Sequence, residues 1–410
     1  MSSASGSKES KDKKKKNTVN KNSKMNQVDE SSRKKLTGSV EMSKKDETYE
    51  KAKVAIKTTI GWMTQTQSKP GGLLGHFKAA TFERNPPENP KCYAFQANRA
   101  KNRNPDFPLN DHSRVRLKVE DESENNYINA TNISCPPCDR KWIVSQHPME
   151  KFYEDFWRMW RRALFCKLPI RGFDSTRLQS FFASFLKIFY HEIDVIFAIF
   201  SPDEQLPTYF PTEQGKFANH GQFFVHCWKM TPPSGKYHAT NYTIEVLPNG
   251  CSNARYVTIL HYPHWPKGYV APSAKVVLKG IQALEPAEKL TKSKCLVHSA
   301  EGINRAMSFV MVDYVVELMF RNNTVDVIEL ITQLRSQRRG AFQNRMFCVY
   351  ALYVAIDYVK IRLTKFQNAP EVLAEINSLQ KAMKKEFSGI IPKETGGTSK
   401  KGATIEATVE

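Results

Sequence analysis

The chain has 410 residues, of which 40% are apolar and 11% aromatic, enough to build a large hydrophobic core. This composition excludes a wholly disordered chain and a small disulfide scaffold. The 61 basic residues outnumber the 41 acidic ones, so phosphoryl groups, nucleic acid and anionic lipid are all compatible partners. No apolar run approaches the roughly 18 residues of a membrane span, and no charged-then-apolar leader begins the chain. We therefore expect a protein of a reducing compartment, cytoplasmic or nuclear, with no transmembrane segment.

Residues 1–50 contain almost no large apolar side chains and include the run Lys13–Lys16 among serine, asparagine and threonine. Such a segment buries too little surface to offset its ordering entropy, so we predict a disordered basic tail. The lysine run fits a nuclear-import signal, a membrane-surface patch or a plain solvating tail. Residues 389–410 are predicted to be a second disordered end.

Between these ends, residues 51–380 show a mixed α and β pattern, which predicts one α/β domain. Apolar alternation and short apolar runs predict strands at residues 114–117, 192–200, 242–246, 256–260 and 294–297. Helical spacing predicts helices at residues 152–162, 308–321, 324–335 and 342–363.

The predicted strand 294–297 runs directly into His298-Ser299-Ala300-Glu301-Gly302-Ile303-Asn304-Arg305 and then into a helix. A tight loop between a strand and a helix N-terminus points several backbone N–H groups at one place, where the helix dipole also favours negative charge. An arginine at the end of such a loop can hold two phosphate oxygens. The arrangement is typical of a phosphate site, although an ordinary strand-to-helix turn has the same outline.

Several other segments occur in a fixed order around this loop. They are Lys101-Asn102-Arg103-Asn104, Asp111 to Val115, Tyr127-Ile128-Asn129-Ala130, Trp142 to Pro148, Phe156-Trp157-Arg158-Met159, His261-Tyr262 with Trp265-Pro266, and Gln343. Together they resemble the protein tyrosine phosphatase domain, of the tyrosine-specific, non-receptor type, over roughly residues 77–363. The resemblance implies a tyrosine-phosphatase fold, a central twisted mixed sheet flanked by helices.

Three positions depart from the catalytic pattern of the family. The nucleophilic cysteine is Ser299, the aspartic acid that follows Trp-Pro is Lys267, and the hydroxyl residue after the signature arginine is Ala306. A helix N-terminus can ionise a thiol at neutral pH but leaves an alcohol protonated. An ammonium beside a phosphate dianion holds its proton tightly and is a poor general acid. We therefore expect a degenerate member, a pseudophosphatase with no intact catalytic residue.

The residues that would bind phosphotyrosine differ from those that would hydrolyse it. By resemblance, phosphate would be held by the loop residues Ser299, Ala300, Glu301, Gly302, Ile303, Asn304 and Arg305. Asp106 stands where the family clamps the peptide backbone, Gln343 should line the pocket, and Asn104 replaces the aromatic side chain that stacks on the substrate ring. Glu301 adds a carboxylate to the cradle, which opposes phosphate binding unless it folds outward to pair with Lys267.

These observations leave three functions open. The leading hypothesis is a signalling protein that binds phosphotyrosine proteins without hydrolysing them. The alternatives are a phosphatase with residual activity, using Ser299 or a water held by Gln343, and a phosphate-independent scaffold. No cofactor, no metal and no nucleic-acid partner is expected, and the chain should be a monomer.

Two features do not fit the resemblance. Cys135-Pro136-Pro137-Cys138 has the spacing of a metal or redox pair, but no second pair of ligands follows, so we expect an ordinary loop. The thiols at Cys166, Cys227, Cys251 and Cys348 are expected to be packing or surface groups. Residues 163–191 form a Phe-rich insertion that is absent from the family pattern, either a partner-binding helix or a translated intron.

Overall fold

The computed structural model describes residues 50–78, 91–118, 125–161, 193–284, 294–366 and 369–392. The predicted N-terminal tail before Glu50, the unusual segment 163–191 and most of the predicted C-terminal end lie outside the described residues.

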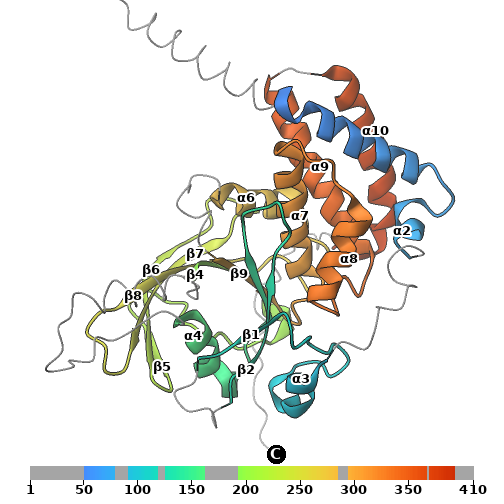
Figure 1. The fold of residues 1–410 in the computed structure, drawn as a ribbon. Helices are drawn as coiled ribbons and strands as arrows, with labels where there is room; N and C mark the ends of the chain where they lie inside the picture. Colours follow the sequence, from blue (N-terminus) through green and yellow to red (C-terminus); the bar gives the residue numbers. More distant parts are fainter. Residues whose placement is uncertain are drawn as a thin grey trace, which may run out of the picture. The chain divides into compact units, whose positions relative to one another are not determined.

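Nine strands of the described residues form one sheet (Figure 1). They are β1 (Arg114–Arg116), β2 (Tyr127–Ile133), β3 (Trp142–Gln146), β4 (Ile193–Ile199), β5 (Phe217–His220), β6 (Phe223–Thr231), β7 (Thr240–Pro248), β8 (Arg255–His261) and β9 (Lys294–Ser299). Their order across the sheet is β1-β2-β3-β9-β4-β8-β7-β6-β5. The four middle strands, β3, β9, β4 and β8, are parallel to one another, and the outer pairs are antiparallel. The expected central mixed sheet is therefore confirmed.

The burial of each strand follows from its place in the sheet. β9 lies between two parallel neighbours and is buried from Cys295 onward, which explains its continuous apolar run. β7 belongs to the antiparallel half, where buried and half-buried side chains alternate. Its alternating sequence is that of a strand with only one face against the core.

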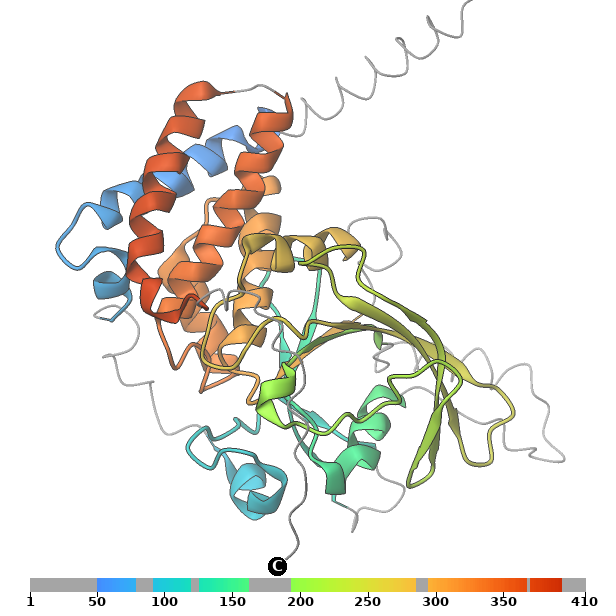
Figure 2. The same cartoon turned by 180° about the vertical axis from the view of Figure 1, so that it is seen from behind.

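Helices cover both faces of the sheet (Figures 1 and 2). They are α2 (Gly72–Phe77), α3 (Tyr93–Ala97), α4 (Tyr153–Arg161), α6 (Ala274–Leu284), α7 (Arg305–Phe320), α8 (Val327–Gln337), α9 (Met346–Phe366) and α10 (Pro370–Glu386). Ile196 and Phe197 are neighbours in β4 and so point to opposite faces. Ile196 belongs to the buried cluster that includes the α4 side chains, whereas the ring of Phe197 packs 4.7 Å from that of Phe309 on α7.

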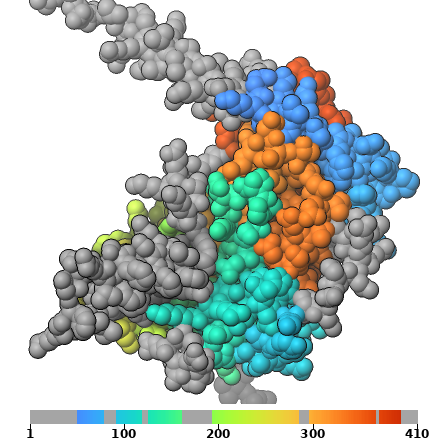
Figure 3. All heavy atoms as spheres, viewed as in Figure 1, coloured from blue at the N-terminus to red at the C-terminus, as the bar shows by residue number. Residues whose placement is uncertain are grey.

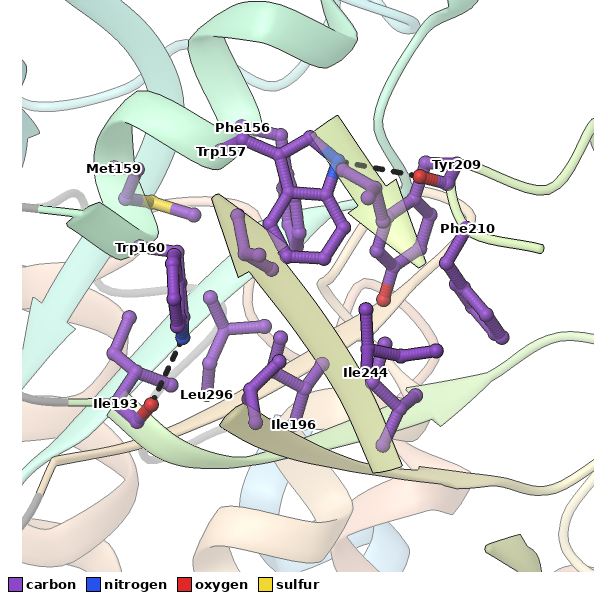
Figure 4. Close-up of a cluster of buried hydrophobic side chains, with 14 of the residues drawn as sticks. Phe156, Trp157, Met159, Trp160, Ile193, Ile196, Tyr209, Phe210, Ile244 and Leu296 are labelled. Carbon is purple, nitrogen blue, oxygen red and sulfur yellow. Dashed lines mark hydrogen bonds between the residues drawn. The ribbon is translucent and has the colours of Figure 1, made fainter. Parts of the chain in front are cut away.

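The core on the α4 face is built around two tryptophans that this helix inserts against the sheet (Figure 4). Trp157 donates its indole N–H to the carbonyl of Tyr209 at 3.2 Å, and Trp160 donates to the carbonyl of Ile193 at 3.0 Å. Both indoles are therefore buried without leaving a donor unpaired, which would be costly in an apolar core.

Each strand and helix predicted from the sequence is present, with ends shifted by a few residues. Helices α2, α3 and α6 were not predicted, nor were two longer helical segments. One covers residues 50–67, and the other is α10, whose buried side chains recur at intervals of three and four residues. The Glu386 carboxylate of α10 accepts hydrogen bonds from the N–H groups of Leu73 and Leu74, so the two ends of the described chain pack together (Figure 3).

Candidate functional site

The predicted phosphate loop joins the C-terminal end of β9 to the first turn of α7. Gly302 has φ +67°, and a Cβ added there would lie 2.2 Å from the carbonyl oxygen of Ser145 on β3. Only glycine fits this close approach without strain. The loop carbonyls of Ser299 and Ala300 accept the N–H of His147 at 2.8 and 3.1 Å. The backbone of the loop is thus fixed from the side of β3.

A buried arginine that the sequence analysis missed holds the other side of the loop. Arg338, just after α8, is 3% exposed, and burial lowers its pKa to about 10. It donates to the carbonyls of Gly302 at 2.7 Å and Glu301 at 3.0 Å. Because a trans peptide points its N–H away from its C=O, these contacts turn the next two N–H groups, of Gly302 and Ile303, to the opposite side. The loop therefore retains the outline of an anion cradle.

Arg305 at the end of the loop is paired with an acidic residue from another segment. Its guanidinium donates to both carboxylate oxygens of Glu204 at 2.6 Å, and the two side chains are only 3% and 4% exposed. Burial opposes the ionisation of Glu204, but the hydrogen bonds and charge of Arg305 outweigh it and hold the pKa of Glu204 below its usual value. The pair is buried, bidentate and ionised.

The remaining donors of Arg305 decide whether it can still hold an anion. Nη1 also donates to the carbonyl of Trp265 at 2.6 Å, so the bonds to Glu204 and Trp265 use three of the five guanidinium N–H groups. Among the described residues, no hydrogen bond uses Nε–H or the second N–H of Nη2. These two donors share one edge of the planar group. That edge is suited to two oxygens of a phosphate.

The three residues expected at the catalytic positions of the family are Ser299, Lys267 and Ala306. Ser299 is 3% exposed, and no acidic or histidine side chain of the described residues hydrogen-bonds its hydroxyl. The neighbouring His298 is buried and uses Nε2 in a 2.9 Å bond to the hydroxyl of Tyr209, so it is not placed as a base for Ser299. Ala306 is fully buried and carries no hydroxyl. Within the described part of the chain, Ser299 has no activating partner.

Lys267 and Glu301 meet across the site. Lys267 Nζ lies 2.9 Å from Glu301 Oε1, with side-chain exposures of 56% and 23%. The predicted pairing of these two residues is therefore present. The ion pair links the turn after Trp265-Pro266 to the cradle, and it is exposed enough that its contribution to stability is small.

A pocket beside the cradle brings some of the predicted recognition residues together. It is a shallow hollow open to solvent, with an enclosed volume of only about 10 Å³, and is lined by Asn104, Phe107, Pro108, Leu109, Asn129, Gln146, Glu301, Ile303, Arg338 and Gly340. Asn104 and Glu301 thus face the same space. Asp106 and Gln343 do not line it and are exposed on neighbouring loops, where Asp106 donates its N–H to the side chain of Asn104 at 2.8 Å.

Three histidines form a cluster beneath the loop. His147 and His298 are fully buried, and the ring of Phe200 lies 4.6 Å from that of His147 and 4.2 Å from that of His261. Burial lowers the pKa of His147 and of His261 to about 4, and it places that of His298 well below its usual value. All three rings are neutral at pH 7, so they add no positive charge beneath the cradle.

The described residues contain neither a membrane-spanning helix nor a metal-binding cluster. No helix there is long and apolar enough to cross a membrane, and no group of three or more His, Cys, Asp or Glu side chains is arranged to hold a metal ion. Cys227 and Cys348 are buried free thiols, as expected. Cys251 is disulfide-bonded, so the prediction of a free thiol there was wrong, and Cys166 lies outside the described residues.

Comparison with known proteins decides the family. The model of the protein-tyrosine phosphatase family matches residues 98–163 and 178–357, more than half of the chain. This chain belongs to the protein-tyrosine phosphatase family. The matched ranges include the phosphate loop, Lys267 and the other segments described above. The family match omits residues 164–177 of the predicted insertion 163–191 and includes residues 178–191.

The similar proteins are mostly receptor-type phosphatases. The chain is 26% identical to human receptor-type tyrosine-protein phosphatase epsilon over 252 residues, 61% of this chain and 32% of that protein. It is 25% identical to rat receptor-type phosphatase zeta over 295 residues, 69% of this chain and 11% of that protein. A putative tyrosine-protein phosphatase of Caenorhabditis elegans is 25% identical over 256 residues, 62% of this chain and 55% of that protein. The matches thus span about half or less of these relatives, and the receptor-type names do not match the expected non-receptor type.

Proposed function

We propose that this phosphatase domain binds phosphotyrosine side chains of other proteins and does not hydrolyse them. The observation that carries the proposal is the contrast between two parts of one loop. Arg305 keeps an unused guanidinium edge beside the cradle, whereas Ser299 lacks both a thiol and an activating partner among the described residues. The residue that would bind phosphate and the residue that would attack it are thus different residues of the same loop.

The support for binding is geometric. Arg338 fixes the loop carbonyls on one side, so backbone N–H groups face the other. The helix dipole of α7 adds to the attraction for a dianion at this end. The adjoining hollow, lined by Asn104 and Ile303, opens to solvent beside the loop, so a phosphotyrosine ring would lie over its surface, where Asn104 provides less stacking than an aromatic side chain would.

The support for inactivity is chemical. A serine hydroxyl without a base is a far weaker nucleophile than a thiolate at neutral pH. Lys267 stands at the position of the general acid, and loss of general acid–base assistance alone costs about 10² to 10⁴ in rate. Loss of the thiolate comes on top of this, so we expect no measurable turnover.

The test is calorimetric titration of the full chain with phosphotyrosine peptides and their unphosphorylated twins. We expect phosphate-dependent binding that Arg305→Lys weakens at least tenfold, because a lysine retains the charge beside Glu204 but loses the planar fork. Arg116→Lys, at an exposed position on β1, is the matched control and should bind as the parent does. Thermal melts confirm that each variant is folded.

Two other results would replace the proposal. Equal affinity for both peptides of each pair would favour a phosphate-independent scaffold. Release of inorganic phosphate that depends on Arg305 would favour residual phosphatase activity.

A further inference from the structure

The Cys135-Pro136-Pro137-Cys138 segment lies outside the phosphate site, in the connection from β2 to β3. Cys138 N–H donates to the carbonyl of Cys135 at 2.8 Å, which closes a four-residue turn. In such a turn the first and last Cα atoms lie within about 7 Å of each other. A disulfide needs a Cα separation of about 4.4–6.8 Å. The backbone therefore already holds the two cysteines at disulfide range.

The side chains of this turn are reduced in the structure. Both cysteines are free: the thiol of Cys135 donates to the side-chain oxygen of Gln333 at 3.9 Å, and that of Cys138 donates to the carbonyl of Tyr314 at 4.0 Å. The neighbouring Cys138 lowers the pKa of Cys135, whereas Cys135 and burial raise the pKa of Cys138. Cys135 is therefore favoured as the thiolate. The intervening prolines are exposed, so the turn lies at the surface although the two thiols are 3% and 8% exposed.

The ends of the turn are held by α7. The hydroxyl of Tyr314 lies 3.1 Å from the carbonyl of Ile133 and 3.2 Å from that of Arg140, one residue on each flank of the connection. The N–H of Asp139 donates to the Glu317 carboxylate at 3.1 Å. Because both flanks are anchored, the two thiols stay together whether or not they are bonded.

A second anchor comes from α8. The side-chain oxygen of Gln337 accepts a hydrogen bond from the N–H of Ser134, and its side-chain nitrogen donates one to the carbonyl of the same residue, both at 2.9 Å. Closing a sulfur–sulfur bond across this turn requires side-chain rotation and no movement of either helix.

We propose that Cys135 and Cys138 form a reversible disulfide by exchange with low-molecular-weight disulfides such as glutathione disulfide. The Cys135 thiolate attacks one sulfur of glutathione disulfide, giving a mixed disulfide and a glutathione thiolate. Cys138 gives up its proton and attacks the Cys135 sulfur, and a second glutathione thiolate leaves. The protein loses two electrons and two protons, and the oxidised glutathione becomes two molecules of glutathione.

The test equilibrates the full chain in glutathione buffers of increasing oxidation, quenches it in acid and alkylates the remaining thiols. Peptide mass spectrometry then measures the fraction of Cys135–Cys138 disulfide. We expect this disulfide to appear in one step and to disappear on return to reduced glutathione. If both thiols stay alkylated at the most oxidising ratio, or if either cysteine instead pairs with a different residue, the proposal is wrong.

Variants test the order of attack. Cys138→Ser should trap glutathione on Cys135, whereas Cys135→Ser should gain glutathione on Cys138 at least several-fold more slowly. Cys92→Ser is the matched control, since Cys92 is also a buried cysteine outside any disulfide and burial raises its pKa. Faster modification of Cys138 than of Cys135 would overturn the assigned roles. The wild-type peptide map tests for the disulfide even if a variant fails to fold.

Discussion

Lys267 Nζ lies 2.9 Å from Glu301 Oε1, so these two charged residues beside the phosphate loop form an ion pair with each other. Either residue alone would leave an unmatched charge beside the cradle. Together they are locally neutral and link the turn after Trp265-Pro266 to the phosphate loop. A phosphate that enters the site offers Lys267 a second anionic partner and meets repulsion from Glu301.

Removing the carboxylate should therefore improve binding. We predict that Glu301→Gln tightens the affinity for a phosphotyrosine peptide about three- to tenfold, or ~1 kcal/mol, because it removes a like charge and releases Lys267 toward the phosphate. Titration calorimetry at two salt concentrations measures this change. Glu213→Gln, at an exposed position outside the site, should leave the affinity unchanged.

The same pair makes a prediction for stability. In a double-mutant cycle with Lys267→Ala and Glu301→Ala, the coupling free energy should be about 0.2–1 kcal/mol, because Lys267 is more than half exposed and solvent screens the pair. Denaturant unfolding of the four proteins gives the value. Strictly additive losses would show that the contact is not energetically significant.

The buried Arg305–Glu204 pair should behave differently. Glu204→Ala would leave the guanidinium buried without its carboxylate, and we predict a loss of about 3–5 kcal/mol in the free energy of unfolding. Glu213→Ala is the exposed control and should change stability by no more than about 0.5 kcal/mol. A loss at Glu204 as small as that of the control would mean that Arg305 does not depend on this partner.

Restoring catalysis should need more than the nucleophile. We predict that Ser299→Cys alone stays nearly inactive, and that Ser299→Cys with Lys267→Asp gains little, because the new aspartate would face Glu301. Adding Glu301→Ala removes this repulsion and should raise p-nitrophenyl phosphate hydrolysis by about 10² or more over Ser299→Cys alone. Equal rates for the double and triple variants would contradict the role assigned to Glu301.

The buried histidines predict acid sensitivity. Their ordinary pKa of about 6.5 applies in the unfolded chain, whereas in the folded chain it is about 4 for His147 and His261. The unfolded state therefore binds more protons between these values, and stability present above about pH 6.5 should fall as the pH drops toward 4. Each histidine contributes up to about 1.4 kcal/mol per pH unit.

Denaturant unfolding between pH 7.5 and 4.5 measures this slope. Asp313 opposes it, since burial raises its pKa to about 6, but the histidines outnumber it. His147→Gln should reduce the slope, and His112→Gln, at an exposed position, should not. A stability that stays flat down to pH 5 would contradict the neutral cluster.

The sequence predicted those features of the site that depend on short segments of the chain or on their order. Gly302 was predicted within the loop because a strand, a tight turn and an arginine follow one another in the chain. The Lys267–Glu301 pair was predicted from complementary signs at two positions that the family resemblance brings together. Both inferences use short segments or an established order of segments.

The rest depends on contacts that no local pattern contains. Arg338 reaches the loop from 36 residues away along the chain and looks like any basic residue in a polar run. Glu204 lies 101 residues before Arg305 in a turn of ordinary composition. His147 lies in a segment that resembles the family, but only the packed structure shows that its ring enters a buried cluster. Long-range partners of buried charges need three-dimensional information.

A single-turnover experiment tests whether this chain binds phosphotyrosine without hydrolysing it. The full chain is mixed in excess with a phosphotyrosine peptide that it has been shown to bind, and inorganic phosphate is followed over hours. We predict bound, intact phosphopeptide and no phosphate above the buffer control. Stoichiometric phosphate release that Ser299→Ala abolishes would contradict it and would identify this chain as an enzyme with a serine nucleophile.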